Sequence, residues 1–195
     1  KIYTQKSLEL SEKMKFQKGV QEAHFFYANI YYKESSFEAA INHANICLKM
    51  CKSRNDKESE AKCFNLLGIT NRKKGEYNKS LSFYFKALPI WEEVGNKRKI
   101  AVLLNNIGLI YYYIEKYVDA LKYYNASFKI SKEINYESGK SIYYNNCGLV
   151  FHNQKQYQKA LEYFENSLQI EKKQDDKYGI TICYVNIGDI YRALE

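Results

Sequence analysis

The sequence predicts an all-α fold in which pairs of antiparallel helices are stacked one on the next. Two observations predict it. Glycine recurs at a step of 40 residues, as Gly68, Gly108, Gly148 and Gly188, and Ala28 extends the series backwards. The chain of 195 residues has one proline and is 46% apolar, which suits a helical protein with a core. A fixed period of this length is typical of repeat proteins, whose units bury their apolar faces against one another.

Each unit contains two amphipathic segments joined by a short turn. In the unit that begins at Ala101, the first segment has apolar or small residues at the i, i+3, i+4, i+7 spacing of one helical face: Leu104, Ile107, Gly108 and Tyr111. The second segment has a similar face: Tyr117, Ala120, Leu121, Tyr124 and Phe128. Glycine within a helix costs about 1 kcal/mol against alanine, so its recurrence predicts close approach of the paired helix. Ala28 suggests that a methyl group is tolerated there.

The period predicts a single solenoid over residues 1–195, with about ten helices. Residues 1–20 align with the second helix of a preceding unit, and 181–195 align with a first helix. Four full units lie between them: 21–60, 61–100, 101–140 and 141–180. We therefore expect the chain to be a fragment of a longer protein, and we expect end-to-end self-association through the apolar faces at its two ends. Pro89 is expected to kink or break its helix.

The recurring positions resemble those of the tetratricopeptide repeat family. The family's pattern of a large residue, an apolar residue before glycine, an aromatic residue, and small and aromatic residues in the second helix appears as Leu104, Ile107-Gly108, Tyr111, Ala120, Tyr124 and Ser127. The next unit has Tyr144, Cys147-Gly148, Phe151, Ala160, Phe164 and Ser167. Asn71 departs from the pattern, and the step exceeds the family's usual length of about 34 residues. The longer form is similar to that of the kinesin light chain, spindle-orientation adaptors and bacterial signalling proteins.

The resemblance implies a right-handed superhelix whose first helices line a concave groove. Asparagine is a poor residue for the interior of a helix, yet it recurs on this face, and an amide offers a donor and an acceptor that match a peptide backbone. The predicted groove residues are Asn65, Arg72, Asn105, Asn106, Tyr112, Asn145, Asn146, His152 and Asn186. A second interpretation stays open, in which the asparagine amides join neighbouring first helices and stiffen the stack.

No catalytic pattern accompanies these residues. The sequence contains no HExxH motif, Walker loop or dinucleotide fingerprint, and His24, His43 and His152 fall at unrelated positions of the repeat. We therefore predict a protein that is not an enzyme and has no cofactor.

The five cysteines are interpreted as buried free thiols, because they stand at mostly apolar or small repeat positions: Cys47, Cys51, Cys63, Cys147 and Cys183. Cys47 and Cys51 lie one helical turn apart and Cys63 opens the next unit, but no fourth metal ligand recurs nearby. The sequence therefore favours no metal site. Free thiols also favour a reducing compartment, hence the cytoplasm; in a membrane sensor kinase the segment would instead be periplasmic.

The formal net charge of +8 is spread along every unit. This indicates a solvated surface with a mild preference for acidic partners, rather than a nucleic-acid site. Binding of RNA would predict a steep dependence of affinity on salt. No stretch approaches the length of about 20 apolar residues that spans a membrane.

The predicted function is a non-catalytic protein–protein interaction module that binds a peptide segment or protein partner in its concave groove. The alternative is a sensory or regulatory domain of a bacterial signalling protein, such as a histidine kinase or transcriptional regulator. The sequence beyond Glu195 would distinguish the two.

Overall fold

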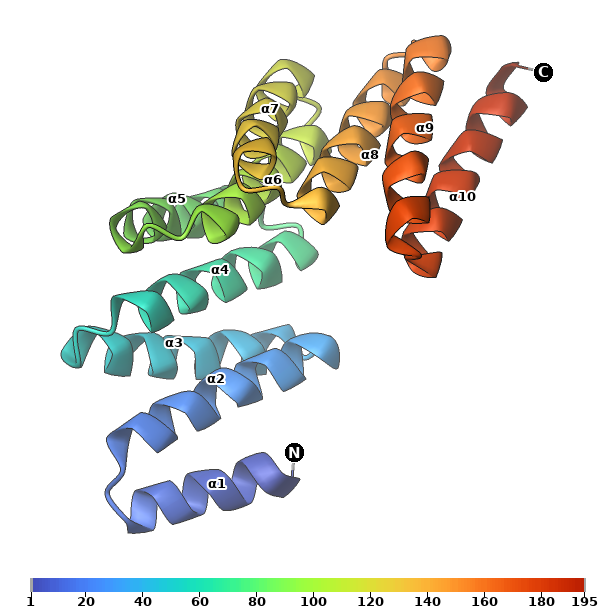
Figure 1. Cartoon of the computed structure of the whole chain (residues 1–195). Helices are drawn as coiled ribbons and strands as arrows, with labels where there is room; N and C mark the ends of the chain where they lie inside the picture. Colours follow the sequence, from blue (N-terminus) through green and yellow to red (C-terminus); the bar gives the residue numbers. More distant parts are fainter. Residues whose placement is uncertain (1, 195) are drawn as a thin grey trace. The chain divides into compact units, whose positions relative to one another are not determined.

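A computed structural model describes residues 2–194, in which every regular element is an α-helix (Figure 1). The helices of this range are α1 (Ile2–Lys13), α2 (Gln17–Lys33), α3 (Phe37–Ser53), α4 (Lys57–Lys73), α5 (Tyr77–Val94), α6 (Lys97–Tyr113), α7 (Tyr117–Glu133), α8 (Glu137–Asn153), α9 (Tyr157–Gln174) and α10 (Lys177–Leu194). The predicted all-α fold is confirmed.

The helices keep the 40-residue step of the sequence. The first helices of successive hairpins, α2, α4, α6, α8 and α10, begin at residues 17, 57, 97, 137 and 177. Each start lies four residues before a boundary of the 40-residue repeats, and in α4 and α6 it directly follows an N-cap residue. Asp56 and Asn96 are two such caps, and their side-chain oxygens accept the backbone N–H of Ser59 and Lys99, each at 3.1 Å.

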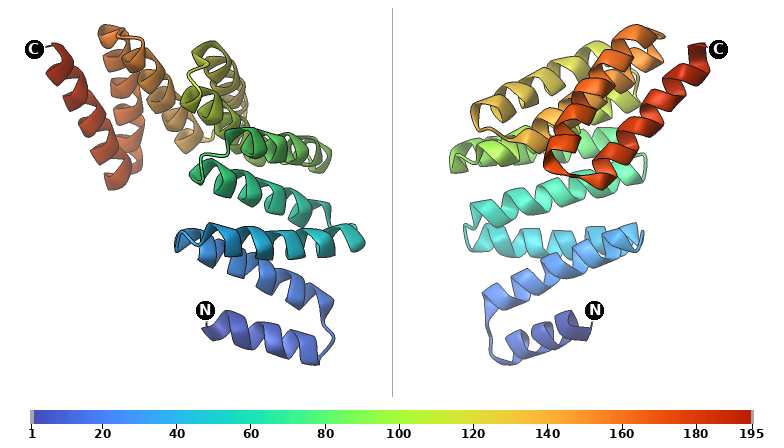
Figure 2. Two further views of the ribbon diagram at one scale, coloured as in Figure 1. Left: turned by 180° about the vertical axis from the view of Figure 1, so that it is seen from behind. Right: turned by 45° about the vertical axis from the view of Figure 1, so that its right-hand side comes forward.

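The chain forms two compact units, each larger than one 40-residue repeat. From here on, the first unit is Lys1–Gly95 with α1 to α5, and the second unit is Asn96–Glu195 with α6 to α10. Within each unit every helix packs against the next one along the chain, in the antiparallel order that Figure 2 shows from two further sides. First helices of neighbouring hairpins also meet: α2 with α4 in the first unit, and α6 with α8 and α8 with α10 in the second. This second set of contacts creates a face made of first helices alone.

The recurring glycine lies where an aromatic side chain of the second helix crosses the first. A Cβ atom on these glycines would lie under 3.0 Å from an aromatic ring of the paired helix: Gly68 from Tyr84, Gly108 from Tyr124 and Gly148 from Phe164. All three rings are buried. The predicted close approach is therefore confirmed, and its cause is a ring that needs the space of the missing methyl group.

The hairpin of α2 and α3, which we call the first hairpin, has other residues at both positions of this pair. Position 28 is alanine, and the position equivalent to the ring is Ala44; both are buried. The methyl group of Ala28 fits because its counterpart is small too. The inference that a methyl group is tolerated at the glycine position is therefore wrong for the hairpins that carry the ring.

Helix α5 runs through Pro89 to Val94, so of the expected kink or break, a break does not occur. The helix ends at Gly95 instead, which adopts a left-handed conformation with φ of 72°. Such a residue commonly follows the last turn of a helix.

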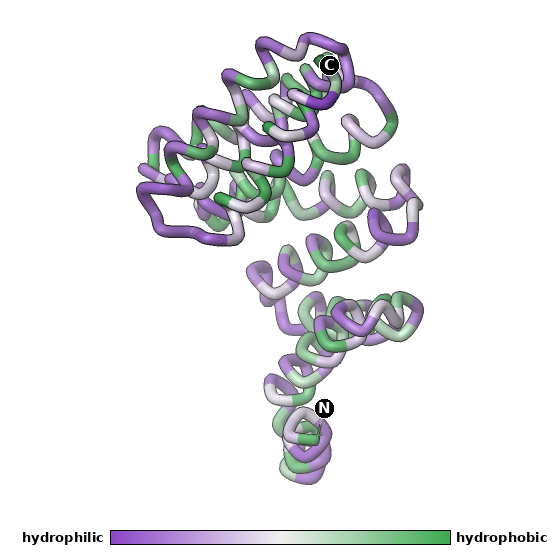
Figure 3. Tube along the Cα trace, turned by 90° about the vertical axis from the view of Figure 1, so that its right-hand side faces the viewer, coloured by the Kyte–Doolittle hydropathy of each residue, from purple (hydrophilic) through white to green (hydrophobic). Residues whose placement is uncertain are grey.

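Hydrophobic and hydrophilic residues are interspersed along the helices, as the hydropathy colours of Figure 3 show. Aromatic side chains supply much of the core of the second unit, where the rings of Phe128 and Tyr143 stack with centroids 4.0 Å apart. Between residues 2 and 194, no helix is apolar over a length that would cross a bilayer.

Candidate partner-binding site

Four of the predicted asparagines form hydrogen bonds between neighbouring first helices. Asn146 Nδ2 donates to Asn105 Oδ1 at 2.8 Å and joins α8 to α6. Asn186 Nδ2 donates to Asn145 Oδ1 at 2.7 Å and joins α10 to α8. We call these two bonds the asparagine ladder. They are the contacts expected from the second interpretation of the sequence, in which the amides stiffen the stack.

The ladder uses only part of each amide. Each bond takes the carbonyl oxygen of one side chain and one N–H of the other, whereas an asparagine can make several hydrogen bonds. Asn105, Asn145 and Asn186 are half-buried and Asn146 is buried. A structural role in the ladder therefore does not exhaust the polar groups on this face.

Three of the predicted residues, one of them also in the asparagine ladder, meet at one cavity of the second unit. Tyr112 of α6, His152 of α8 and Asn186 of α10 line a cavity of about 240 Å³. The remaining lining residues are Leu149, Asn153, Phe164 and Asp189. The three successive first helices thus each contribute at least one side chain to this site, which we call the Tyr112 cavity.

Hydrogen bonds orient the polar rim of the Tyr112 cavity. The Tyr112 hydroxyl accepts a hydrogen bond from Asn153 Nδ2 at 3.1 Å. The Tyr112 hydroxyl, whose pKa of ordinarily 10.0 is raised further by burial, can donate to a ligand at neutral pH. The ring of His152 packs at a tilt against Tyr157, with centroids 5.8 Å apart. Asp189 pairs with Arg192 on the same helix.

The size and lining of the Tyr112 cavity suit part of a peptide. Its volume lies below the roughly 300–1,000 Å³ of most small-molecule sites, so it suits one or two side chains better than a cofactor. Leu149 and Phe164 offer apolar contact, while hydroxyl, imidazole, amide and carboxylate groups offer both donors and acceptors.

The remaining predicted residues lie elsewhere on the first helices. Asn106 is half-buried on α6, and Asn65 and Arg72 are half-buried on α4 of the first unit. Burial raises the pKa of Tyr84, and the positive charge of Arg72 opposes that rise. Arg72 thus lies near a core residue of its own hairpin.

Two histidines that stand at unrelated positions of the repeat are in contact. His24 of α2 and His43 of α3 have their Nδ1 atoms 2.9 Å apart, and the ring of Tyr27 packs against His43 with centroids 5.0 Å apart. Burial lowers the pKa of both histidines. The sequence carries no direct signal of this contact, because the contact depends on which faces of α2 and α3 meet.

All five cysteines are buried and free, as predicted. Three of them nevertheless converge: the Sγ atoms of Cys47, Cys51 and Cys63 all lie within 4.8 Å of one another. The sequence gives the spacing of Cys47 and Cys51 on one helix, but the placement of Cys63 beside them depends on how α4 packs on α3.

Comparisons with known proteins agree on the fold. A sequence profile described as tetratricopeptide repeat matches residues 65–133 and 140–195. Among curated proteins, none is similar enough in sequence to count as a match.

Solved structures with this fold include BtubC (BKLC) from P. vanneervenii, which has a TM-score of 0.83 and 22% identity over 99% of this chain and 82% of that chain. The STAND protein with a tetratricopeptide repeat sensor, PH0952 from Pyrococcus horikoshii, has a TM-score of 0.79 and 20% identity over 89% of this chain and 27% of that chain. A Rap protein complexed with Competence and Sporulation Factor has a TM-score of 0.76 and 16% identity over 89% of this chain and 52% of that chain. The chain thus spans about a quarter of the length of the PH0952 protein and about half of the length of the Rap protein.

Proposed function

Because the chain belongs to the tetratricopeptide repeat family, a family of protein-interaction modules, we propose that its second unit binds an extended segment of a partner protein. The segment lies across α6, α8 and α10, and one of its side chains enters the Tyr112 cavity. The observation that carries this proposal is that the three successive first helices all contribute side chains to one cavity with apolar and polar walls.

The proposed binding combines two contributions. Burial of an apolar partner side chain against the half-buried Leu149 removes apolar surface from water. The amide groups that the asparagine ladder does not use bind the partner's backbone, at a net gain of about 1 kcal/mol per hydrogen bond. The net positive charge of the chain favours encounter with acidic segments.

Likeness of fold supports a binding role. The Rap protein solved with Competence and Sporulation Factor bound has the same repeat fold. A fold built of stacked hairpins offers a long surface to a partner, and function then depends on the side chains of that surface.

Selection of peptides tests the proposal. A phage-displayed library of random peptides is panned on the purified chain, and selected peptides are measured against Tyr112→Ala and His152→Ala variants. Loss of a central tyrosine contact costs about 2 kcal/mol, so we expect Tyr112→Ala to weaken binding by more than about tenfold.

The matched control is Tyr178→Ala, which removes a tyrosine of the same unit that is 77% exposed and lies outside the cavity. This variant should bind the selected peptides as wild type does. If no peptide is selected, or if selected peptides bind folded Tyr112→Ala and His152→Ala unchanged, the proposed site is wrong.

A second candidate is a sensory or regulatory domain of a signalling protein. The likeness of fold to PH0952, which is described as having a tetratricopeptide repeat sensor, supports this candidate. Reading the coding sequence on both sides of the segment tests it: a histidine kinase or DNA-binding domain would favour regulation, and further repeats with a terminal cap would favour a scaffold.

A further inference from the structure

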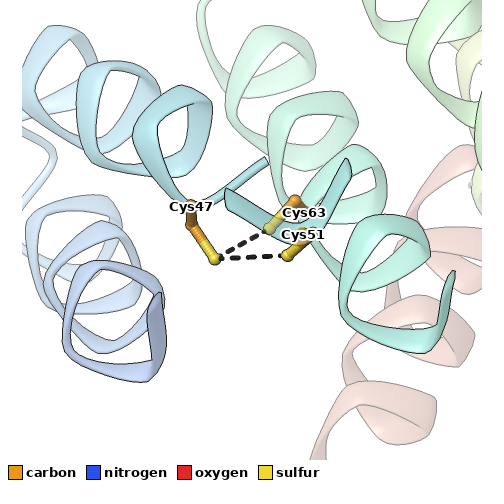
Figure 4. A group of neighbouring side chains, drawn as sticks. All are labelled: Cys47, Cys51 and Cys63. Atoms are coloured by element: carbon orange, nitrogen blue, oxygen red, sulfur yellow. Dashed lines mark hydrogen bonds between the residues drawn. The ribbon is translucent and has the colours of Figure 1, made fainter. Parts of the chain in front are cut away.

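Three thiols of the first unit meet at the junction of α3 and α4 (Figure 4). Cys47 and Cys51 lie one turn apart on α3, and Cys63 faces them from α4. The Sγ atom of Cys47 lies 3.8 Å from that of Cys51 and 3.3 Å from that of Cys63. Each of the three side chains is at most 1% exposed. We call this group the thiol cluster.

The spacing of the thiol cluster is close to that of sulfur ligands around one metal ion. Zinc–sulfur bonds of about 2.3 Å in tetrahedral geometry place two sulfur ligands about 3.8 Å apart. The separation of Cys47 and Cys51 equals this value, that of Cys47 and Cys63 is 0.5 Å shorter, and all three sulfurs lie within 4.8 Å of one another, so small rotations of the side chains would bring them to one ion. Three neutral thiols gain little from such convergence, because S–H groups are weak donors and weak acceptors.

A second observation comes from Gln21, which lines a cavity next to the thiol cluster. Gln21 and Cys47 both line a cavity of about 280 Å³ between α2, α3 and α4. Gln21 is only 2% exposed; its Nε2 donates to Asp56 Oδ2 at 2.7 Å, while its Oε1 has no hydrogen-bond partner. A buried acceptor without a donor costs about 1–3 kcal/mol, so this oxygen is suited to a ligand or to a water bound to one.

We propose that Cys47, Cys51 and Cys63 bind one thiophilic metal ion, Zn²⁺ or Cu⁺, with the remaining coordination position facing Gln21. Thiolate ligands select these ions over Mg²⁺ and Ca²⁺, which prefer oxygen. The expectation of no metal site rested on the lack of a fourth recurring ligand; three thiolates with one further position are themselves a known kind of zinc site. The inference is independent of the proposed peptide binding.

The repeat offers a matched control. Three steps of 40 residues after the thiol cluster, the equivalent residues are Ser167, Glu171 and Cys183. Cys183 is also buried, but its two neighbours cannot supply thiolates. A variant of Cys183 therefore removes a buried cysteine from the same repeat position without touching the thiol cluster.

Metal binding is measured on the reduced, chelator-treated chain. Zn²⁺ is titrated in competition with a chromophoric chelator, and Cu⁺ is titrated anaerobically in competition with bicinchoninate; bound metal is counted by mass spectrometry after gel filtration. We expect one equivalent per chain of one or both ions for wild type and for Cys183→Ser. We expect Cys51→Ser to lose at least tenfold in affinity for the bound ion. If wild type binds only one of the two ions, that ion is the one the site selects.

A spectroscopic measurement on wild type covers the case in which Cys51→Ser does not fold. Cd²⁺ bound by thiolates absorbs in the ultraviolet through sulfur-to-metal charge transfer, whereas Cd²⁺ on surface carboxylates does not. A band that saturates at one equivalent supports the site. Absence of the band, absence of stoichiometric Zn²⁺ and Cu⁺, or equal binding by folded Cys51→Ser overturns it.

Discussion

The junction of α3 with α4 and the junction of α9 with α10 occupy the same positions of the repeat, yet their chemistry differs. In the first unit the three positions hold the thiol cluster. In the second unit they hold Ser167, Glu171 and Cys183. There Ser141 donates a hydrogen bond to the buried Glu171 carboxylate, and the Ser141 and Ser167 hydroxyl oxygens lie 2.8 Å apart. The repeat thus fixes where three side chains meet, and the residues at each junction determine whether the groups that meet are thiols alone or include hydroxyl and carboxylate oxygens.

The strongest way to test this comparison is to build a second thiol cluster at the α9–α10 junction. We expect the double variant Ser167→Cys/Glu171→Cys to place three thiols at the α9–α10 junction, because Cys183 is already there. Bound Zn²⁺ or Cu⁺ should rise from one to two equivalents per chain in the same titrations. A folded double variant that still binds one equivalent would mean that position in the repeat is not sufficient to form the site.

The glycine–ring pair provides the next largest effect, and it compares the first hairpin with the others. A methyl group on Gly108 would lie 2.6 Å from the Tyr124 ring, and overpacking of a core costs about 1–3 kcal/mol. Alanine regains about 1 kcal/mol of helix propensity. We expect Gly108→Ala to lower the free energy of unfolding by up to about 2 kcal/mol, measured by urea denaturation.

The double variant Gly108→Ala/Tyr124→Ala gives this hairpin the same alanine pair as the first hairpin, and it serves as the control. Its loss of stability should be smaller than the sum of the two single losses, because the clash disappears with the ring. Additive losses would contradict the pairing of glycine with the ring.

The asparagine ladder is expected to have a smaller effect. Asn105→Ala and Asn146→Ala should each lower the free energy of unfolding by about 1 kcal/mol, since each removes one side of a half-buried hydrogen bond. In the first unit the equivalent positions are Phe25 and Leu66, so the ladder is not a requirement of the repeat. A double-mutant cycle measures the coupling between the two amides, and a coupling of zero would rule out a stabilising ladder.

The histidine pair should have the smallest effect, visible as a dependence of stability on pH. Burial lowers the pKa of His24 and His43 from an ordinary value of 6.5. The unfolded chain therefore binds protons more readily below that pH, so stability is fully present above pH 6.5 and is lost as pH falls through the folded-state pKa values. Thermal unfolding between pH 7.5 and 5.5 measures this loss.

The neighbouring hairpin supplies the control for the histidine pair. Its equivalent residues are Phe64 and Phe83, whose rings lie 6.3 Å apart. We expect His24→Phe/His43→Phe to unfold with a weaker dependence on pH between 7.5 and 5.5. An unchanged slope would assign the dependence to other groups.

Sequence alone predicts the features that repeat along one helix. The period of 40 residues gives the all-α fold and the helix order, and glycine within a helix points to close packing at Gly68, Gly108 and Gly148. Contacts between helices are harder to predict, because they depend on which faces meet. For this reason the convergence of Cys63 on Cys47, and the contact of His24 with His43, emerge only when the helices are packed.

In the candidate site, too, the residues of one helix face are predictable from the sequence and the contacts between helices are not. Its face is predictable, since Tyr112, His152 and Asn186 follow from helical spacing. The pairing of Asn105 with Asn146 is not, because the hydrogen bonds join residues 41 positions apart rather than 40. A linear period of 40 residues does not contain that offset.

The glycine and the ring that fills its space belong to one hairpin, and this has a consequence for how such a gene can change. A duplication or deletion of one whole hairpin carries both members of the pair together, so every copy arrives with its internal packing complete. The thiol cluster takes Cys47 and Cys51 from one hairpin and Cys63 from the next. Recombination at that boundary would separate these residues, so the cluster is inherited only when the two hairpins remain adjacent.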